Sequence, residues 1–384
     1  MGDEIRYLFI AGAARSGTTL ITNLLDGHQD LLVFPMEHKV FKKYFTNPAG
    51  RRSDYFSTDF IEHRTEGQQS VLGSRALFEA YRARMQREFA IDFRLDVDAG
   101  RFLDVYRASI SDADVSLETI FRALSEALMA SRLSNGEAGP RPRWAVFKDP
   151  FTTEFFAQHA SRELTTARYL HVIRDPYARY ASFKKRQLRR GRVLPRSVVP
   201  RINFRDFVSG FAEQAIASLH RGLENQRVLG PDRYRIVRFE DVVADPEAEL
   251  RELSEWLDVD FDAAMLQPSR LGKSTESGSS FSPTSRIDPT TVDRGRAYFM
   301  DMTSSSERDV YNRCLALSDY GRYYALIHPT GDGPSLYTWS KPYKHERLRD
   351  YAWRLASRQG FVESDAEASA LKTRLPDLYL RGVI

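Results

Sequence analysis

Hydrophobic residues occur in this chain either as short unbroken runs or at helical spacing, and the two patterns follow each other in turn. The first run, RYLFIAGAA at residues 6–14, is apolar and ends in small residues, which is typical of a buried strand that enters a tight turn. In the stretch TTLITNLL that follows shortly after, Leu20, Leu24 and Leu25 recur at the spacing of one helix face. We therefore predict a strand, a glycine-rich loop and a helix at the start of the chain.

The same alternation continues along the chain. Three further apolar runs stop at a proline: LLVFP at 31–35, WAVFKDP at 144–150 and ARYLHVIRDP at 167–176. Helical spacing predicts helices over 76–90, over 115–133 and directly after the third of these runs. Strands that alternate with helices predict an α/β fold, in which helices cover both faces of a central, mainly parallel sheet.

A fifth strand and its helix are predicted further on. The stretch YRIVRFEDVVADPEAELRELSEWL, residues 234–257, predicts a strand, a turn and a helix, with Asp245 as the N-cap and Pro246 at the first helical position. Residues 272–290 are rich in Ser, Thr and Gly, and this composition predicts a loop.

The length and composition favour one large soluble domain. We expect this domain over residues 1–330, with a lid-like insertion at about 40–140 and an extension over 331–384 packed on it. The hydrophobic content of 42% and the charged content of 28% are ordinary for a soluble protein, and no stretch approaches the roughly 20 apolar residues that cross a bilayer. No signal-peptide pattern is present, and the single cysteine, Cys314, excludes an internal disulfide framework, so we expect a cytoplasmic protein. The net charge of +4 suits anionic ligands but is too small to indicate nucleic acid.

The first loop has the chemistry of a phosphate site. Gly12 and Gly17 have the G-x-x-x-x-G spacing of a nucleotide-triphosphatase loop, but Thr18 and Thr19 follow where a lysine is expected. A strand–loop–helix of this kind points backbone N–H groups at one anion, at the positive end of a helix dipole. Arg15 lies inside the loop, and nothing in the sequence marks an acidic strand that would hold magnesium.

Three segments, in order, resemble the sulfotransferase family that uses 3′-phosphoadenosine-5′-phosphosulfate (PAPS). GAARSGTTL at 12–20 resembles the 5′-phosphosulfate loop of that family, and VIRDPYARYASF at 172–183 resembles its 3′-phosphate strand–turn–helix. Residues 236–262 resemble the next strand and helix of the family. The resemblance runs from about residue 6 to residue 325 and is loose over 40–140.

The resemblance implies a P-loop-like three-layer sandwich and gives roles to individual residues. The loop residues would bind the 5′-phosphosulfate: Arg15, Ser16, Gly17, Thr18 and Thr19. Arg174, and Ser182 eight residues later, would hold the 3′-phosphate. An arginine fork pairs bidentately with a phosphate, and this contact would distinguish PAPS from ATP, which lacks the 3′-phosphate.

Three further residues are candidates for the chemistry. Lys148 resembles a family lysine of the pattern K-x-P that lies near the cofactor, although a solvated lysine at a strand end would also fit the sequence. An acceptor hydroxyl needs a general base, and Glu37 and His38 come just after the run LLVFP. MEHKVF resembles the K-E-x-x-x-F setting of the glutamate base in the carbohydrate-acting branch, with Met36 in place of the lysine. We take Glu37 as the expected base and His38 as the alternative.

The expected function is therefore metal-independent sulfuryl transfer from PAPS to an acceptor hydroxyl of a carbohydrate, a glycolipid or another metabolite. The product nucleotide would be adenosine 3′,5′-bisphosphate. A P-loop small-molecule kinase that uses ATP and Mg²⁺ is the first alternative, and a binding protein that kept a nucleotide fold is the second. The sequence leaves open the identity of the acceptor and the possibility of a homo-oligomer.

Overall fold

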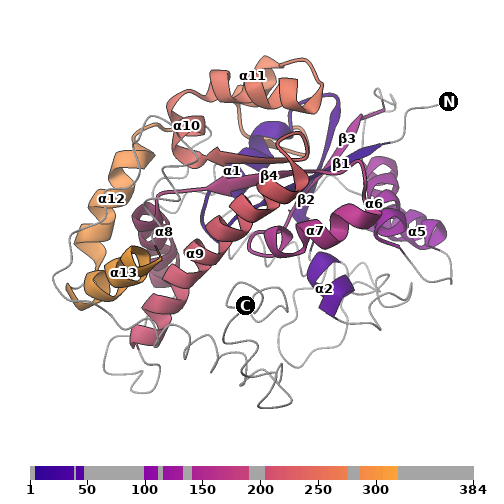
Figure 1. Ribbon diagram of the computed structural model, residues 1–384. Coiled ribbons are helices and arrows are strands. Elements are labelled where there is room, and N and C mark those ends of the chain that lie inside the picture. The colour runs from indigo at the N-terminus through magenta and orange to yellow at the C-terminus, as the bar shows by residue number, and fades with distance from the viewer. Residues whose placement is uncertain are drawn as a thin grey trace, which may run out of the picture.

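A five-stranded sheet forms the centre of the molecule (Figure 1). The computed structural model describes residues 5–38, 40–46, 99–110, 116–132, 141–189, 204–275, 286–303 and 305–318. The strands are β1 (Arg6–Ala11), β2 (Leu31–Glu37), β3 (Trp144–Lys148), β4 (Arg168–Ile173) and β5 (Tyr234–Arg238). Their order in the sheet is β2-β3-β1-β4-β5, and every neighbouring pair is parallel. The predicted α/β fold with a parallel sheet is confirmed.

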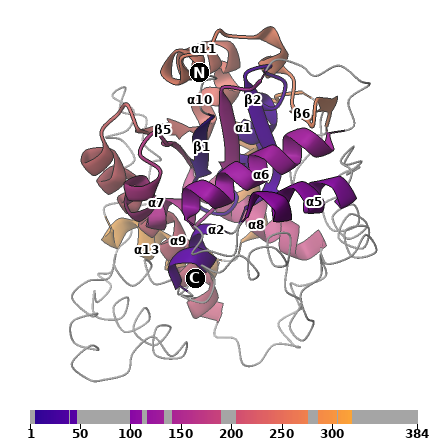
Figure 2. The same cartoon turned by 90° about the vertical axis from the view of Figure 1, so that its right-hand side faces the viewer.

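Both faces of the sheet are buried. Successive side chains of a strand point to opposite sides, so each strand contributes to two separate cores. Tyr7 and Phe9 of β1 pack in one hydrophobic core, whereas Leu8 and Ile10 pack in the other. The first core is covered by α2 (Val40–Thr46), α5 (Ala99–Ser109), α6 (Leu117–Ser131) and α7 (Thr153–Glu163). The second is covered by α1 (Thr18–Leu25), α10 (Phe239–Ala244), α11 (Pro246–Leu257) and the 3₁₀ helix η2 (Ala263–Leu266). Figure 2 shows α5 and α6 in front of the sheet and α11 beyond its upper end. The three-layer sandwich is thereby confirmed.

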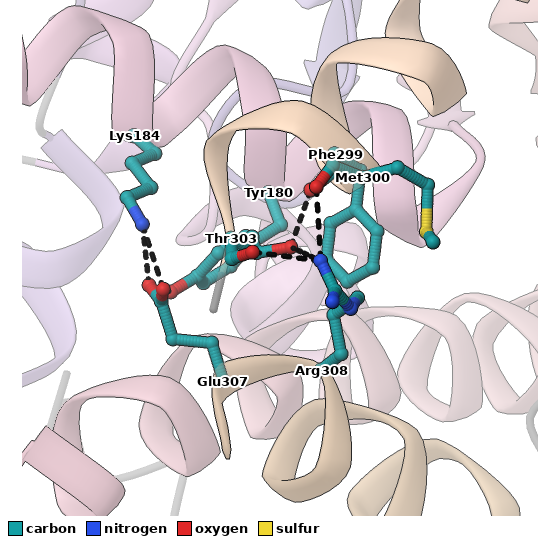
Figure 3. A network of polar contacts seen from close by, with 7 residues as sticks. All are labelled: Tyr180, Lys184, Phe299, Met300, Thr303, Glu307 and Arg308. Atoms are coloured by element: carbon teal, nitrogen blue, oxygen red, sulfur yellow. Dashed lines mark hydrogen bonds and ion pairs between the residues drawn. The ribbon is translucent and has the colours of Figure 1, made fainter. Parts of the chain in front are cut away.

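A third hydrophobic core lies among helices that flank the end of the sheet near β4 and β5. It is built by α8 (Pro176–Arg189), α9 (Phe204–Leu229), α12 (Thr291–Met302) and α13 (Ser305–Leu317). Aromatic rings fill it, with Tyr180, Phe299 and Tyr311 in mutual contact. A polar network over the same helices, including the ion pair of Lys184 with Glu307, ties α8 to α13 (Figure 3).

Strand β2 is longer than the sequence predicted. Pro35 was expected to stop it, but the strand runs to Glu37, and its pairing with β3 shifts register between Val33 and Glu37. Proline has no N–H to donate to a sheet, and a bulge is one of the few places where a strand tolerates it. Glu37 therefore lies at the end of the strand itself, and it is paired with Lys148 of β3.

Other predicted elements lie where the sequence indicated or outside the described residues. The helix predicted over 115–133 is α6, and α11 begins with Pro246 while the Asp245 side chain accepts the Ala248 N–H at 3.1 Å. The loop predicted over 272–290 contains β7 (Lys273–Ser274), which forms a hairpin with β6 (Ser269–Arg270). The helix predicted over 76–90 and the extension over 331–384 lie outside the described residues.

Candidate active site

The candidate residues gather at one edge of the sheet. Because all five strands are parallel, their carboxyl ends lie at the same edge, which is where open α/β sheets bind ligands. Strands β2 and β3 lie on one side of β1 in the sheet, and β4 and β5 lie on its other side. The chain changes sides when it crosses from β3 to β4, so β1 lies at the switch point of the topology. The loop after β1 and the segment after β4 therefore border the same crevice.

The loop after β1 needs its glycines. Gly12 has a φ of 138° and Gly17 has a φ of 103°, values that favour residues without a Cβ. A Cβ on Gly17 would lie 2.1 Å from Cδ2 of Phe239, so this residue also brings the loop close to α10. Arg15 too has a positive φ, 74°, and the Ser16 N–H donates to the Ala13 carbonyl at 3.0 Å. These contacts form a tight turn that leads into helix α1.

Helix α1 presents its N-terminus at this turn. It begins at Thr18 with Gly17 as the N-cap, and no acidic residue occupies its first turn. The first N–H groups of a helix have no acceptor within the helix, and together with the helix dipole they form an anion site. Thr18 is buried and Thr19 is half-buried, so backbone and hydroxyl donors meet here.

Lys148 reaches this same site from β3. Its side chain is buried, and its ammonium donates to Oγ1 of Thr19 at 3.0 Å. Glu37, which is half-buried, pairs in register with Lys148, so the two side chains leave neighbouring strands on the same face of the sheet. Lys148 and Thr19 are thus in contact at the carboxyl end of the sheet, and Glu37 lies beside Lys148 on the neighbouring strand.

The two predicted phosphate sites are in direct contact. Arg15 donates through Nε and Nη2 to Oγ of Ser182 on α8, each at 3.1 Å. Arg174, at the end of β4, donates to the Arg15 carbonyl at 3.4 Å, and its guanidinium lies 4.1 Å from the centre of the Phe239 ring. Arg174 and Ser182 are both buried. The structure therefore brings the loop, the end of β4 and α8 together around two arginines.

Asp175 shapes the segment that carries these residues. One carboxylate oxygen accepts the N–H groups of Tyr177 and Ala178 at 2.9 Å, and the other is 2.7 Å from Arg296 of α12. The Asp175 N–H donates to Glu240 at 2.9 Å, and burial followed by the nearby Asp175 charge raises the pKa of Glu240. Helix α8 therefore begins at a fixed place beside α10 and α12.

His38 occupies a different environment from Glu37. It is fully buried, and its ring lies among those of Phe9, Phe41 and Phe121 with centroids 4.9 to 5.8 Å away. Its Nδ1 accepts the Val40 N–H at 3.2 Å. The imidazole thus lies within the aromatic core behind the strand ends.

The sequence did not single out three residues that contact the loop. Phe239 packs on Gly17 and Arg174, and Arg179 of α8 donates to the Ala14 carbonyl at 3.1 Å. Glu154 of α7 accepts the Gly12 N–H at 3.2 Å. Arg179 lies one turn before Ser182 in the motif VIRDPYARYASF, so helical spacing could have indicated it. For Glu154 and Phe239 the sequence carries no local signal.

Two features are absent from the residues that the structure describes. No group of three or more His, Cys, Asp or Glu side chains there could hold a metal ion. Within those residues no helix is both long enough and apolar enough to cross a membrane.

A parallel sheet with a glycine-rich loop, a helix N-terminus and two arginines at its switch point defines an α/β protein with a P-loop-like fold. The family model described as "Sulfotransferase family" matches residues 8–263, and the chain belongs to this family. Protein-tyrosine sulfotransferase A of Caenorhabditis elegans is 26% identical over 162 residues, which span 42% of this chain and 39% of that relative.

Two solved structures are similar to this chain, and the first of them shows the same fold. The sulfotransferase domain from the curacin biosynthetic pathway has a TM-score of 0.50 at 18% identity, covering 82% of this chain and 98% of its own. The sulfotransferase domain of the olefin synthase from Synechococcus PCC 7002 has a TM-score of 0.49 at 20% identity, covering 83% and 96%. At 18% identity, the likeness to the first of these domains concerns the fold alone.

Proposed function

We propose that this protein transfers a sulfuryl group from PAPS to an acceptor hydroxyl. The observation that carries the proposal is the contact of Arg15 with Ser182, next to Arg174. This contact joins the loop, which lacks the nucleotide-triphosphatase lysine, to a second basic site. A ligand with phosphates at both its 5′ and 3′ positions needs two such neighbouring sites. Membership of the sulfotransferase family supports the reaction class.

The loop and Lys148 would act on the leaving group. In sulfuryl transfer the acceptor oxygen bonds to sulfur while the bond from sulfur to the 5′-phosphate oxygen breaks, and negative charge grows on that phosphate. The N-terminal amides of α1 are donors fixed in advance, which is how preorganised sites stabilise developing charge. Lys148, 3.0 Å from the Thr19 hydroxyl, would add a positive charge at the same place.

Arg174 and Ser182 would recognise the 3′-phosphate, and Arg15, whose backbone lies in the 5′-phosphosulfate loop, directs its side chain toward Ser182. A guanidinium donates in a planar fork that matches phosphate oxygens, and buried charge-assisted hydrogen bonds are stronger than neutral ones. Arg174 is held in place by the Phe239 ring and the Arg15 carbonyl. A nucleotide without a 3′-phosphate would lose these contacts.

Glu37 would take the proton of the acceptor hydroxyl. Its carboxyl group is half-buried and pairs in register with Lys148, whereas the His38 ring is surrounded by aromatic side chains. The relative from Caenorhabditis elegans is named for protein tyrosine, whose hydroxyl needs the same proton removal as a sugar hydroxyl. We therefore propose a hydroxyl acceptor, with tyrosine peptides and carbohydrates as the first ones to assay.

A thermal-shift assay tests the donor. We expect adenosine 3′,5′-bisphosphate to raise the melting temperature in the presence of EDTA, because a ligand that binds only the folded state stabilises it. A rise with ATP and Mg²⁺ and none with the bisphosphate would favour a kinase and overturn the proposal. Turnover of radiolabelled PAPS with a panel of hydroxyl acceptors then separates an enzyme from a binding protein, since only an enzyme labels an acceptor.

A further inference from the structure

Gly12, the first residue of the loop, has both its N–H and its carbonyl group hydrogen-bonded. The Gly12 N–H donates to Oε2 of Glu154 at 3.2 Å, and the Gly12 carbonyl accepts the Phe151 N–H at 2.7 Å. Both partners belong to the segment that follows β3. A Cβ on Gly12 would lie 2.4 Å from the Val172 carbonyl oxygen, so the residue is also enclosed by β4. The starting point of the loop is therefore fixed from two sides.

Glu154 is fully buried and accepts a second hydrogen bond from a chain of polar side chains. Ser218 of α9 donates to Oε1 of Glu154 at 2.7 Å. Nε2 of His171 lies 3.1 Å from Oγ of Ser218, and Nδ1 of His171 lies 2.7 Å from the Tyr234 hydroxyl. This series of hydrogen bonds thus links residues of α7, α9, β4 and β5, and it ends at the N–H group of Gly12.

The carboxylate sets the direction of these hydrogen bonds. An ionised Glu154 can only accept, so Ser218 donates to it, His171 donates to Ser218 and Tyr234 donates to His171. A protonated Glu154 would donate to Ser218 and keep its other oxygen as the acceptor for Gly12. Hydroxyl groups and a neutral imidazole can reverse their roles, so the same side chains satisfy both states. Burial lowers the pKa of His171 to about 3, which keeps its ring neutral.

Burial, and to a smaller extent the charge of Asp149, favours the neutral form of Glu154. Burial raises the pKa of Glu154 to about 7, the hydrogen bonds from Ser218 and Gly12 oppose this rise, and the Asp149 charge adds to it. Tyr234 of β5 and His171 of β4 belong to the same network. The positive charge of Arg221 on α9 opposes the rise that burial causes in the pKa of Tyr234. The carboxyl group therefore changes its charge near neutral pH, one hydrogen bond away from the loop.

We propose that Glu154 is a positioning residue of the nucleotide loop, which holds Gly12 through its acceptor oxygen and takes up a proton when the nucleotide phosphates bind. The physical reason is that an anion brought to the loop disfavours a negative charge buried behind it. This inference rests on the proposed function, because it assumes that the loop binds a phosphate of the nucleotide.

Calorimetric titration with adenosine 3′,5′-bisphosphate between pH 6.5 and 8.5 tests the proposal. For the unmodified protein we expect the affinity to fall several-fold as pH rises. Glu154→Gln keeps an acceptor oxygen without the charge, so its affinity should stay near the value at pH 6.5 and lose the pH dependence that the wild type shows. Glu154→Ala removes the acceptor and should bind about tenfold more weakly at every pH. Titrations in two buffers of different ionisation enthalpy should show proton uptake for the wild type and none for Glu154→Gln.

Glu163 provides a matched control on the same helix. It is exposed and accepts one backbone N–H, that of Leu117 at 3.1 Å, and one hydroxyl, that of Tyr44 at 2.9 Å, but no contact joins it to the loop. Glu163→Gln should follow the wild type in affinity, pH dependence and proton uptake.

Ser218→Ala gives a second measurement that does not depend on replacing Glu154. It removes the hydrogen bond that lowers the pKa of Glu154, so the pH at which the affinity changes should move upward. The proposal is overturned if Glu154→Gln keeps the pH dependence of the wild type, or if a folded Glu154→Ala binds as tightly as the wild type. No binding by the unmodified protein at any pH would instead refute the proposed nucleotide, and the positioning role with it.

Discussion

Arg15 is one of the residues through which the loop and helix α8 meet. Its guanidinium donates to Ser182, while its backbone carbonyl accepts from Arg174. A nucleotide-triphosphatase lysine would extend from the start of α1 toward a terminal phosphate, whereas this arginine extends across to α8. The direction of the Arg15 side chain matches a ligand that carries a second phosphate on the ribose.

Arg174→Ala should weaken the binding of adenosine 3′,5′-bisphosphate about tenfold to a hundredfold, since hydrogen bonds to charged groups contribute about 1.5 to 3 kcal/mol each. The same change should alter the affinity for adenosine 5′-monophosphate only a few-fold, because that nucleotide has no 3′-phosphate. Calorimetry on both nucleotides makes the comparison. Equal losses for the two ligands would show that Arg174 does not recognise the 3′-phosphate.

Glu37→Gln should abolish turnover and leave the affinity for adenosine 3′,5′-bisphosphate within a few-fold of the wild type. The amide keeps the shape of the side chain but cannot accept the acceptor's proton, and general base catalysis typically contributes a factor of about a hundred to ten thousand. His38→Asn is the companion variant, and we expect it to keep activity in proportion to its folded fraction. An active Glu37→Gln together with an inactive, folded His38→Asn would give the role of base to the histidine.

Among the elements, helix α8 connects the candidate site to the C-terminal helices. Ser182 on this helix contacts the loop, while Tyr180 and Lys184 contact Glu307 of α13 (Figure 3). Arg308 adds hydrogen bonds to the Met300 and Thr303 carbonyls at the end of α12, at 2.9 and 2.7 Å. The position of Ser182 thus depends on contacts that lie on the other side of its helix.

Lys184→Met should lower the free energy of unfolding by about 2 to 3 kcal/mol, because it leaves the carboxylate of Glu307 buried without its ammonium partner. The double variant Lys184→Met/Glu307→Met should lose less than the single one, since it removes the buried charge as well. Urea unfolding measures both. Arg227→Met, which breaks an exposed ion pair with Glu224 on α9, is the control and should leave stability unchanged. A double variant that loses as much stability as Lys184→Met alone, or more, would contradict this account.

For the whole molecule, the sequence predicted what depends on neighbouring residues and missed what depends on distant ones. Strand cores, the cap at Asp245 and the glycine loop follow from local patterns, and the structure contains them. Pro35 misled the prediction because a bulge, which depends on the pairing with β3, lets the strand continue. Glu154 is an ordinary glutamate in a helix until its partner Ser218, 64 residues away, is packed against it. Burial of this kind has no signature in a short window of sequence.

The buried network gives the molecule two opposing dependences of stability on pH. Burial raises the pKa of Glu154 from 4.5 to about 7, so the folded state binds more protons than the unfolded state, and the contribution of Glu154 to stability is lost as pH rises toward 7. Burial lowers the pKa of His171 from 6.5 to about 3, so the contribution of His171 is lost as pH falls from 6.5 toward 3. Between about pH 4.5 and 6.5 the two slopes have opposite signs and largely cancel.

Glu154→Gln should therefore leave the pH dependence of stability that His171 contributes without the opposing contribution of Glu154. Relative to the wild type, the free energy of unfolding of the variant should increase by about 3 kcal/mol between pH 4.5 and pH 8, the equivalent of the pKa shift of Glu154 from 4.5 to about 7. Urea unfolding at each pH gives this difference, in which the titrating groups that do not interact with Glu154 cancel. His171→Asn should act in the opposite direction and steepen the loss of stability as pH rises through the range of the glutamate. Because Ser218 joins the two residues, the double variant should deviate from the sum of the single ones. A difference between Glu154→Gln and wild type that stays constant with pH would show that the carboxyl group titrates as it does in the unfolded chain.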